Sequence, residues 1–269
     1  MDALGIPARY ELWQTEPEEL ASRVASLLAP DCLGANVTIP YKQAVLPYMD
    51  VVDPLAARIG AVNTIVRHDG YLHGYNTDAP GLLHALAEQG IGQRLDDERI
   101  SFAGYTAILL GAGGAARGAA FALASAGVER LIIVNRTLER AQRLAAEVQQ
   151  HSDCRIFCLN DPEFLIPHPS SLIINATPLG MHFAHKDGTH EKNEDSSPLS
   201  ADILARFASD TLVYDMIYHP TQTRLLCQAR ILGLRAINGL SMLLHQGALA
   251  FTLWTGQPAP LEIMRATLF

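Results

Sequence analysis

The sequence predicts an α/β fold built around a doubly wound parallel sheet, because three features follow one another within about 30 residues. Residues 106–110 form a short apolar run of the kind found in buried parallel strands. A glycine-rich turn and an alanine-rich helical stretch follow, and Gly127 marks the end of that helix. Residues 131–134 are a second apolar run, so strand, turn, helix and strand form one βαβ unit.

The turn in this unit has the pattern G-x-G-x-x-A, at Gly111, Gly113 and Ala116. Gly111 permits a tight turn, Gly113 leaves room for a pyrophosphate close to the backbone, and Ala116 lets the helix pack on the strand. The helix N-terminus adds unpaired N–H groups and the positive end of the helix dipole. The pattern favours a dinucleotide site over the alternative, a glycine-rich turn without a ligand.

The end of the second strand indicates which dinucleotide is bound. NAD sites usually place Asp or Glu about 20 residues after the glycines, where it binds the ribose 2′-hydroxyl. Asn135, Arg136 and Thr137 occupy this place, and the next carboxylate is that of Glu139. A guanidinium binds a 2′-phosphate well, and the threonine hydroxyl can donate a further hydrogen bond. We therefore predict NADP rather than NAD, and the alternative for Arg136 is a solvated surface arginine.

Composition excludes several functional classes. The chain has 269 residues, of which 49% are hydrophobic and 18% charged, with a net charge of −8. This is typical of a globular protein of two modest domains or one large domain. There is no cluster of Lys and Arg, no long apolar run and no pattern of a signal peptide, so we expect neither nucleic acid nor membrane as a partner. The four cysteines are scattered without zinc-site spacing, which predicts reduced thiols, no metal site and a cytoplasmic location.

The first 42 residues predict a strand, a helix and then a strand-to-helix junction. Residues 8–13 alternate like a strand, residues 17–28 have the pattern of an amphipathic helix, and a helix is expected to start at Pro40. The junction projects Asn36, Thr38 and Lys42 into one region. A desolvated lysine there is a candidate proton donor, and the alternative is a helix lysine that extends its ammonium into water.

Polar loops that follow strand-like runs indicate a polar pocket. Asn63 follows a helix that starts near Asp53, and Asn76, Thr77 and Asp78 follow a hairpin at 65–73. Each loop alone is explained by turn and cap formation, whereas several together resemble one pocket wall. Beyond the βαβ unit we expect helices at 80–89, 138–150, 223–232, 241–254 and from 260 onward, strands at 155–159, 171–175, 211–215 and 235–237, and a surface loop at 182–197.

Taken together, the loops form a set of eight motifs that occur in a characteristic order. With this set the chain resembles the shikimate dehydrogenases over nearly its whole length. The motifs are Asn36-Val-Thr-Ile-Pro-Tyr-Lys42, Gly60-Ala-Val-Asn-Thr64, Asn76-Thr-Asp78, Gly111-Ala-Gly-Gly-Ala-Ala-Arg117, Asn135-Arg-Thr137, Asn175-Ala-Thr-Pro-Leu-Gly-Met181, Tyr214-Asp215 with Tyr218 and Pro220, and Asn238-Gly-Leu240 with Met242 and Gln246.

The resemblance implies an enzyme that reduces 3-dehydroshikimate to shikimate with NADPH, in the biosynthesis of chorismate and aromatic amino acids. It implies a substrate-binding α/β domain at 1–79, a Rossmann-like NADP domain at 80–237 and C-terminal helices at 238–269 that return to the first domain. We expect a monomer or homodimer with a small-molecule substrate as its partner. The alternatives are a quinate/shikimate dehydrogenase of the same superfamily and a truncated, catalytically impaired NADP-binding protein.

The resemblance also assigns residues to roles. It makes Lys42 the catalytic lysine and Asp78 its carboxylate partner. It implies substrate contacts from Thr38, Asn63, Asp78, Tyr218 and Gln246. The expected cofactor contacts are Gly111, Ala112, Gly113, Gly114, Ala115, Asn135, Arg136, Thr137, Ala176, Thr177, Met181, Met216, Gly239 and Met242.

The chain departs from the family pattern at its start. Family members begin with a strand, a Ser-x-Ser-Pro loop whose serines bind the substrate carboxylate, and a helix that ends near this chain's Gly5. The sequence lacks this segment, which we expect to leave strand edges and apolar surface exposed. A start codon assigned too late and a genuine fragment are the two explanations, and either puts full activity of the chain as written in doubt.

Overall fold

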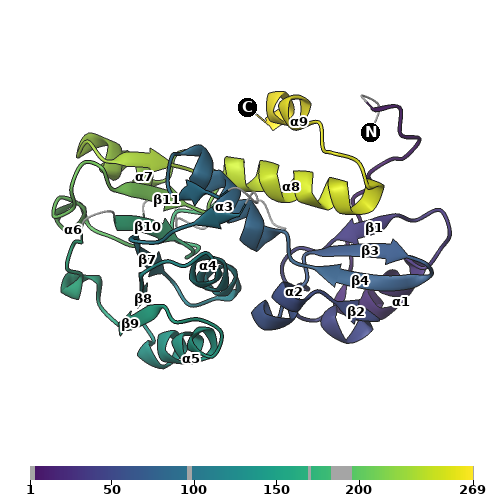
Figure 1. Cartoon of the computed structure of the whole chain (residues 1–269), viewed down its shortest axis with the longest axis horizontal. Coiled ribbons are helices and arrows are strands. Elements are labelled where there is room, and N and C mark those ends of the chain that lie inside the picture. The colour runs from purple at the N-terminus through teal and green to yellow at the C-terminus, as the bar shows by residue number, and fades with distance from the viewer. Residues whose placement is uncertain (1–3, 96–98, 169–170, 183–195, 269) are drawn as a thin grey trace. The chain divides into compact units, whose positions relative to one another are not determined.

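The chain divides into two compact units. The computed structural model describes residues 4–95, 99–168, 171–182 and 196–268 (Figure 1). One unit comprises Met1–Gly81 with Leu244–Phe269, and the other comprises Leu82–Leu243. The predicted boundaries after residues 79 and 237 lie close to these limits. The chain crosses between units inside two helices, α3 (Asp78–Glu88) and α8 (Leu240–Thr255), where no loop in the sequence marks the place.

The unit Leu82–Leu243 contains a six-stranded sheet in which every pairing is parallel. Its order is β12-β11-β10-β7-β8-β9. Counted along the chain, this is the order 3-2-1-4-5-6 of the doubly wound fold, with the switch point between β7 and β10. The predicted fold class is confirmed. The strands are β7 (Thr106–Leu110), β8 (Arg130–Val134), β9 (Arg155–Leu159), β10 (Ser171–Asn175), β11 (Leu212–Asp215) and β12 (Arg235–Ile237).

Helices cover both faces of this sheet, which explains why its central strands are buried throughout and mostly apolar. All residues of β7 and β10 are buried. Ile108 and Leu110 share one core with Leu225 and Leu226, and burial of each such side chain contributes about 1.5–3 kcal/mol. The helices are α4 (Gly114–Ser125), α5 (Leu138–Gln149), α6 (Ala201–Leu204) and α7 (Arg224–Ile231); β5 (Gln93–Arg94) and β6 (Ile100–Ser101) form a small separate sheet.

The other unit contains a mixed four-stranded sheet in the order β1-β3-β4-β2. Strands β3 and β4 are joined by the turn Asp69-Gly70, whose two positive φ angles suit a tight hairpin, and the predicted hairpin is confirmed. Helices α1 and α2 pack on this sheet around a core that includes Val24, Ile65 and Leu72. The elements are α1 (Leu20–Ser26), β1 (Gly34–Asn36), β2 (Val51–Val52), α2 (Pro54–Ile59), β3 (Thr64–His68), β4 (Tyr71–Tyr75) and, near the C-terminus, α9 (Leu261–Leu268), with 3-10 helices at Pro17–Glu19 and Leu46–Tyr48.

Two sequence predictions in this unit are wrong. Residues 8–13 have no regular secondary structure and form no ladder with the described strands, and Leu12 is 91% exposed. The helix expected at Pro40 is a series of turns, because the carbonyl of Lys42 accepts a hydrogen bond from the amide of Val62 instead of continuing a helix. Alternation and a starting proline are local signals, and tertiary contacts override both.

Two further expectations concern the polar loop at 182–197 and membrane-spanning helices. Most of the polar loop expected at 182–197 lies outside the described residues, since these omit 183–195. In the part of the chain that is described, no helix is both long and apolar enough to cross a membrane.

Candidate active site

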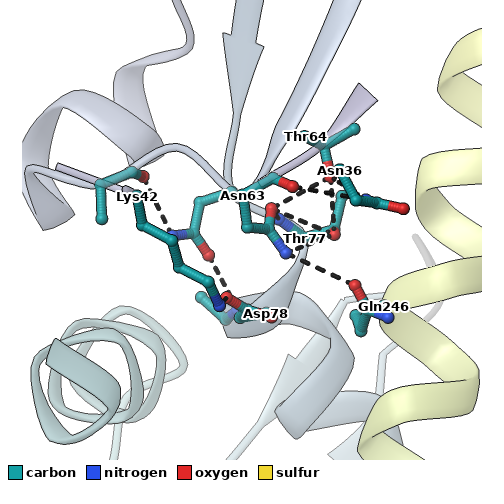
Figure 2. A network of polar contacts seen from close by, with 10 residues as sticks. Asn36, Lys42, Asn63, Thr64, Thr77, Asp78 and Gln246 are labelled. Carbon is teal, nitrogen blue, oxygen red and sulfur yellow. Dashed lines mark hydrogen bonds and ion pairs between the residues drawn. The ribbon is translucent and has the colours of Figure 1, made fainter. Parts of the chain in front are cut away.

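Lys42 and Asp78 form an ion pair within the unit Met1–Gly81 with Leu244–Phe269. The Lys42 Nζ atom lies 2.8 Å from Oδ2 of Asp78, and the two side chains are 30% and 23% exposed. Lys42 comes from the turns after β1, and Asp78 is the first residue of α3, where the helix dipole favours a carboxylate. The fold therefore holds the pair in place (Figure 2), and its partial exposure leaves it accessible to a small molecule.

A buried amide lies next to this pair. Asn63 is 2% exposed. Its Oδ1 accepts a hydrogen bond from the amide of Thr77 at 2.7 Å, and its Nδ2 donates to Thr77 Oγ1 at 3.0 Å and to Gln246 Oε1 at 3.5 Å. Gln246 comes from α8, so residues 183 positions apart in the sequence share one network. Such a network fixes the orientation of amides that can hydrogen-bond substrate hydroxyl groups.

The hairpin explains why these side chains meet. Thr64 pairs with Tyr75 across β3 and β4, so the residue before β3 lies beside those after β4. Asn76 then directs the chain into α3, since its Oδ1 accepts a hydrogen bond from the amide of Ala79 at 3.1 Å. The short segment 76–78 thus follows the end of β4, starts α3 and places Asp78 at the first position of that helix.

Several polar residues in this network had been assigned no substrate role, although the sequence places Asn36 and Thr77 near the expected pocket. Asn36 donates from Nδ2 to the carbonyl of Asn63 at 3.3 Å and to Thr64 Oγ1 at 3.2 Å. The hydroxyl of Tyr10 donates to Asn36 Oδ1 at 3.1 Å. Thr64 and Thr77 are buried. Each is adjacent in the sequence to a predicted site residue, Asn63 or Asp78, and this adjacency could have indicated that they belong to the network. The sequence around Tyr10 gives no such indication.

Two further predicted substrate residues are exposed to solvent. Thr38 is exposed in the turns before Lys42, with its carbonyl accepting a hydrogen bond from the amide of Tyr41. Tyr218 belongs to the unit Leu82–Leu243 and is 44% exposed. The structure thus brings together Lys42, Asp78, Asn63 and Gln246 from the predicted set.

The glycine turn of the other unit fits a pyrophosphate. Gly111 has a φ of +108°, and a Cβ atom there would lie 3.2 Å from the carbonyl oxygen of Ala176, so only glycine suits the position. Gly113 precedes the first turn of α4 and has no side chain with which to cap it. Gly113, Gly114 and Ala115 are exposed, and Ala112 is half-buried between them and Gly111. The free amides of the helix N-terminus are therefore accessible to an anion.

The residues predicted to select NADP adjoin this turn. The amide of Gly111 donates to the carbonyl of Val134, which places the end of β8 beside the glycines. Asn135 donates from Nδ2 to the carbonyl of Thr137 at 2.8 Å and so holds the loop that carries Arg136. Arg136 and Thr137 are exposed. A guanidinium and a hydroxyl at this place suit a 2′-phosphate, which is the group that distinguishes NADP from NAD.

The remaining predicted cofactor residues lie in loops at the carboxyl ends of β10 and β11 and at the start of α8. Gly239 is constrained by its neighbour, because a Cβ atom there would come within 2.3 Å of the carbonyl oxygen of Met216. These loops follow the switch point, where doubly wound sheets bind their ligands. The residues concerned are Ala176, Thr177, Met181, Met216, Gly239 and Met242. Within the described chain, no group of three or more His, Cys, Asp or Glu side chains could hold a metal ion.

Comparison with known proteins decides the family. Models described as shikimate dehydrogenase substrate binding domain, shikimate / quinate 5-dehydrogenase and shikimate 5′-dehydrogenase C-terminal domain match residues 1–65, 94–203 and 239–269. A relative named shikimate dehydrogenase (NADP(+)), from Moorella thermoacetica, is 44% identical over 262 residues, which cover 96% of this chain and 82% of that protein. The chain belongs to the shikimate dehydrogenase family.

Solved structures agree with this membership of the shikimate dehydrogenase family. The shikimate 5-dehydrogenase of Thermus thermophilus, solved in complex with NADP(H) and shikimate, superimposes with a TM-score of 0.80 at 37% identity, covering 99% of this chain and 89% of that one. The 5-ketofructose reductase of a Gluconobacter species gives the same TM-score at 30% identity, with coverage of 99% and 89%. The second likeness shows that the fold also serves a protein named for another substrate.

Proposed function

We propose that this member of the shikimate dehydrogenase family reduces 3-dehydroshikimate to shikimate with NADPH, a step toward chorismate and the aromatic amino acids. The observation that carries the proposal is the Lys42–Asp78 ion pair at 2.8 Å, beside the buried amide of Asn63. The names of the relative from Moorella thermoacetica and of the complex from Thermus thermophilus support the same cofactor and substrate. A cytoplasmic monomer or homodimer acting on a small molecule fits this role.

Lys42 supplies the charge and the proton that carbonyl reduction needs. Negative charge develops on the carbonyl oxygen as its carbon is reduced, and an ammonium group beside that oxygen stabilises the charge and then donates the proton. Asp78 keeps the ammonium in position through the ion pair. A positioned acid of this kind contributes roughly 100- to 10,000-fold in rate.

Other side chains, within this network and outside it, recognise and orient the substrate. Asn63 and Gln246 present amides, and Thr38 presents a hydroxyl, to the hydroxyl groups of a polyhydroxylated ring acid. Tyr218 contributes a phenol that can hydrogen-bond the substrate carboxylate. Because Asn63 is itself held by the amide and hydroxyl of Thr77, it loses little conformational entropy when it binds the ring.

NADP fits the glycine turn and the loop after β8. The α4 N-terminus would hold the pyrophosphate, while Arg136, with Asn135 and Thr137, would hold the 2′-phosphate. When bound, the reduced cofactor supplies the hydride. In this proposal Met1–Gly81 with Leu244–Phe269 is the substrate-binding unit and Leu82–Leu243 the cofactor-binding unit.

The proposal is tested by following the absorbance of NADPH at 340 nm with the purified protein. We expect absorbance to fall only when 3-dehydroshikimate is present, with NADH a much poorer reductant. The reverse reaction with shikimate should exceed that with quinate, a saturated ring acid. Faster oxidation of quinate would favour a quinate/shikimate dehydrogenase, and NADPH binding without turnover would favour a catalytically impaired NADP-binding protein; either result contradicts the proposal.

A further inference from the structure

A fully buried carboxylate lies at the carboxyl end of β11, where the proposed mechanism does not use it. Asp215 is 0% exposed. Its Oδ1 accepts hydrogen bonds from Asn175 Nδ2 at 3.0 Å and from the amide of Ile217 at 3.1 Å, and its Oδ2 accepts one from Thr223 Oγ1 at 2.6 Å. A buried carboxylate is costly unless such bonds compensate it, and burial raises the pKa of Asp215 to about 6 despite them.

One branch of this hydrogen-bond network fixes the loop after β10. Asn175 is the last residue of β10, pairs with Asp215 across the sheet, and is also 0% exposed. Its Oδ1 accepts hydrogen bonds from the amide of Thr177 at 2.9 Å and from Thr177 Oγ1 at 2.7 Å. The carboxylate thereby orients the amide that holds Thr177, a predicted cofactor contact.

The other branch fixes the loop after β11 at both ends. Asp215 accepts from Ile217 at the start of this loop and from Thr223, the N-cap residue of α7, at its end. The carbonyl of Ile217 in turn accepts a hydrogen bond from the amide of Gly239 at 3.0 Å. Met216 lies in the same loop, and its amide donates to the carbonyl of Asn175.

We infer that Asp215 is a positioning residue, whose carboxylate holds the loops after β10 and β11 and the start of α8 in the geometry that the nicotinamide half of NADP requires. The inference rests on the proposed cofactor site, and all of its residues lie within Leu82–Leu243. Arg136, the proposed 2′-phosphate ligand, follows another strand, β8, whereas the glycine turn after β7 lies against Ala176. Removing the carboxylate therefore disturbs the nicotinamide side and leaves the adenosine 2′-phosphate side intact.

The test compares Asp215→Asn with the unaltered protein by two binding probes. Adenosine 2′,5′-bisphosphate carries only the adenosine half of the cofactor, whereas the fluorescence of bound NADPH reports the surroundings of the nicotinamide. We expect the variant to bind the bisphosphate within about 2-fold of the unaltered protein, to lose most of the fluorescence change with NADPH, and to turn over about 10- to 100-fold more slowly, as misplacement by about 1 Å would cause.

The matched control is Thr211→Ala. Thr211 is 1% exposed and immediately precedes β11 at the end of the strand opposite Asp215, so its loss perturbs the same sheet without touching the loops. The kcat and the NADPH fluorescence of the Thr211→Ala variant should stay unchanged. Three outcomes overturn the inference: unchanged kcat and fluorescence in Asp215→Asn, equal loss of affinity for bisphosphate and NADPH, or the same kinetic defect in both variants.

The design separates this inference from the proposed function. A protein that binds NADPH but does not reduce 3-dehydroshikimate would contradict the proposed substrate, and the fluorescence comparison would still test Asp215. A protein that binds the bisphosphate but shows no NADPH fluorescence change before any substitution would overturn the inference itself.

Discussion

The Nζ atom of Lys42 lies 2.8 Å from the Oδ2 atom of Asp78, although the two residues are 36 positions apart in the sequence. The turns after β1 carry one partner, and the first turn of α3 carries the other. An ammonium fixed in this way is prepared for a developing oxyanion before substrate arrives, which is the condition under which charge stabilisation is most effective.

Replacing Lys42 with Met should remove the proton donor and keep most of the side chain's volume. We expect kcat to fall about 100- to 10,000-fold, since a general acid contributes in this range. Affinity for shikimate, measured by calorimetry, should change little because Asn63 and Gln246 remain. Gln43→Met, a neighbour in the same turns, is the control and should behave like the unaltered protein. An unchanged kcat in Lys42→Met would remove this lysine from the mechanism.

Replacing Arg136 with Glu should shift the cofactor preference. The substitution removes a guanidinium that suits a 2′-phosphate and adds a carboxylate that repels it and suits a ribose 2′-hydroxyl. We expect the ratio of kcat/KM for NADPH to that for NADH to fall at least about 10- to 100-fold, the equivalent of one charged hydrogen bond. Arg143→Glu, a charge reversal further along α5, is the control. If the ratio of kcat/KM for NADPH to that for NADH were equal in the two variants, Arg136 would be a solvated surface residue.

Much of the site was predictable from local sequence, and the remainder depends on long-range contacts. Strand β7, the turn at Gly111, helix α4 and strand β8 follow one another directly, so a short window contains all the information that forms them. The contact between Asn63 and Gln246 spans 183 positions, and the resemblance to a family implied only that both residues bind the substrate.

The wrong predictions have the same cause. Residues 8–13 have the alternation of a strand, but a strand also requires a partner, which the described sheet does not give them. The motif Tyr214-Asp215 indicates no role for Asp215, because its importance comes from three hydrogen-bond partners that only the folded chain brings together.

Two glycines should respond in opposite ways to replacement by Ala. At Gly239 the new Cβ atom would lie 2.3 Å from the carbonyl oxygen of Met216, so the backbone has to move and we expect a loss of about 1–3 kcal/mol. Gly118 lies within α4 and has no neighbouring atom within 4 Å of the new Cβ, so the better helix former should add about 0.5–1 kcal/mol. Thermal midpoints of the two variants check both signs, and midpoints that move in the same direction would contradict the steric argument.

Asp215→Asn should remove a pH dependence of stability. The pKa of Asp215 is raised from 3.8 to about 6, mainly by burial, so the folded chain holds a proton that the unfolded chain releases between these values. The contribution of Asp215 to the free energy of unfolding therefore falls as pH rises from about 4 to about 6. The fall amounts to about 3 kcal/mol for a pKa raised by about two pH units, and the contribution is constant above about pH 6. The amide variant does not titrate, so its stability relative to the unaltered protein should rise across this window.

Urea unfolding at about pH 4.5, about pH 5.5 and about pH 7 measures this difference, and other titrating groups cancel because both proteins share them. The control is Asp202→Asn, which removes an exposed carboxylate in the first turn of α6. Plots of its unfolding free energy against pH should run parallel to those of the unaltered protein. Parallel curves for Asp215→Asn would show that its carboxylate is not destabilised by burial. A rising difference, together with slower turnover of the same variant at neutral pH, would show that the folded chain retains an ionised buried carboxylate at a cost in stability because the loops around the nicotinamide need it.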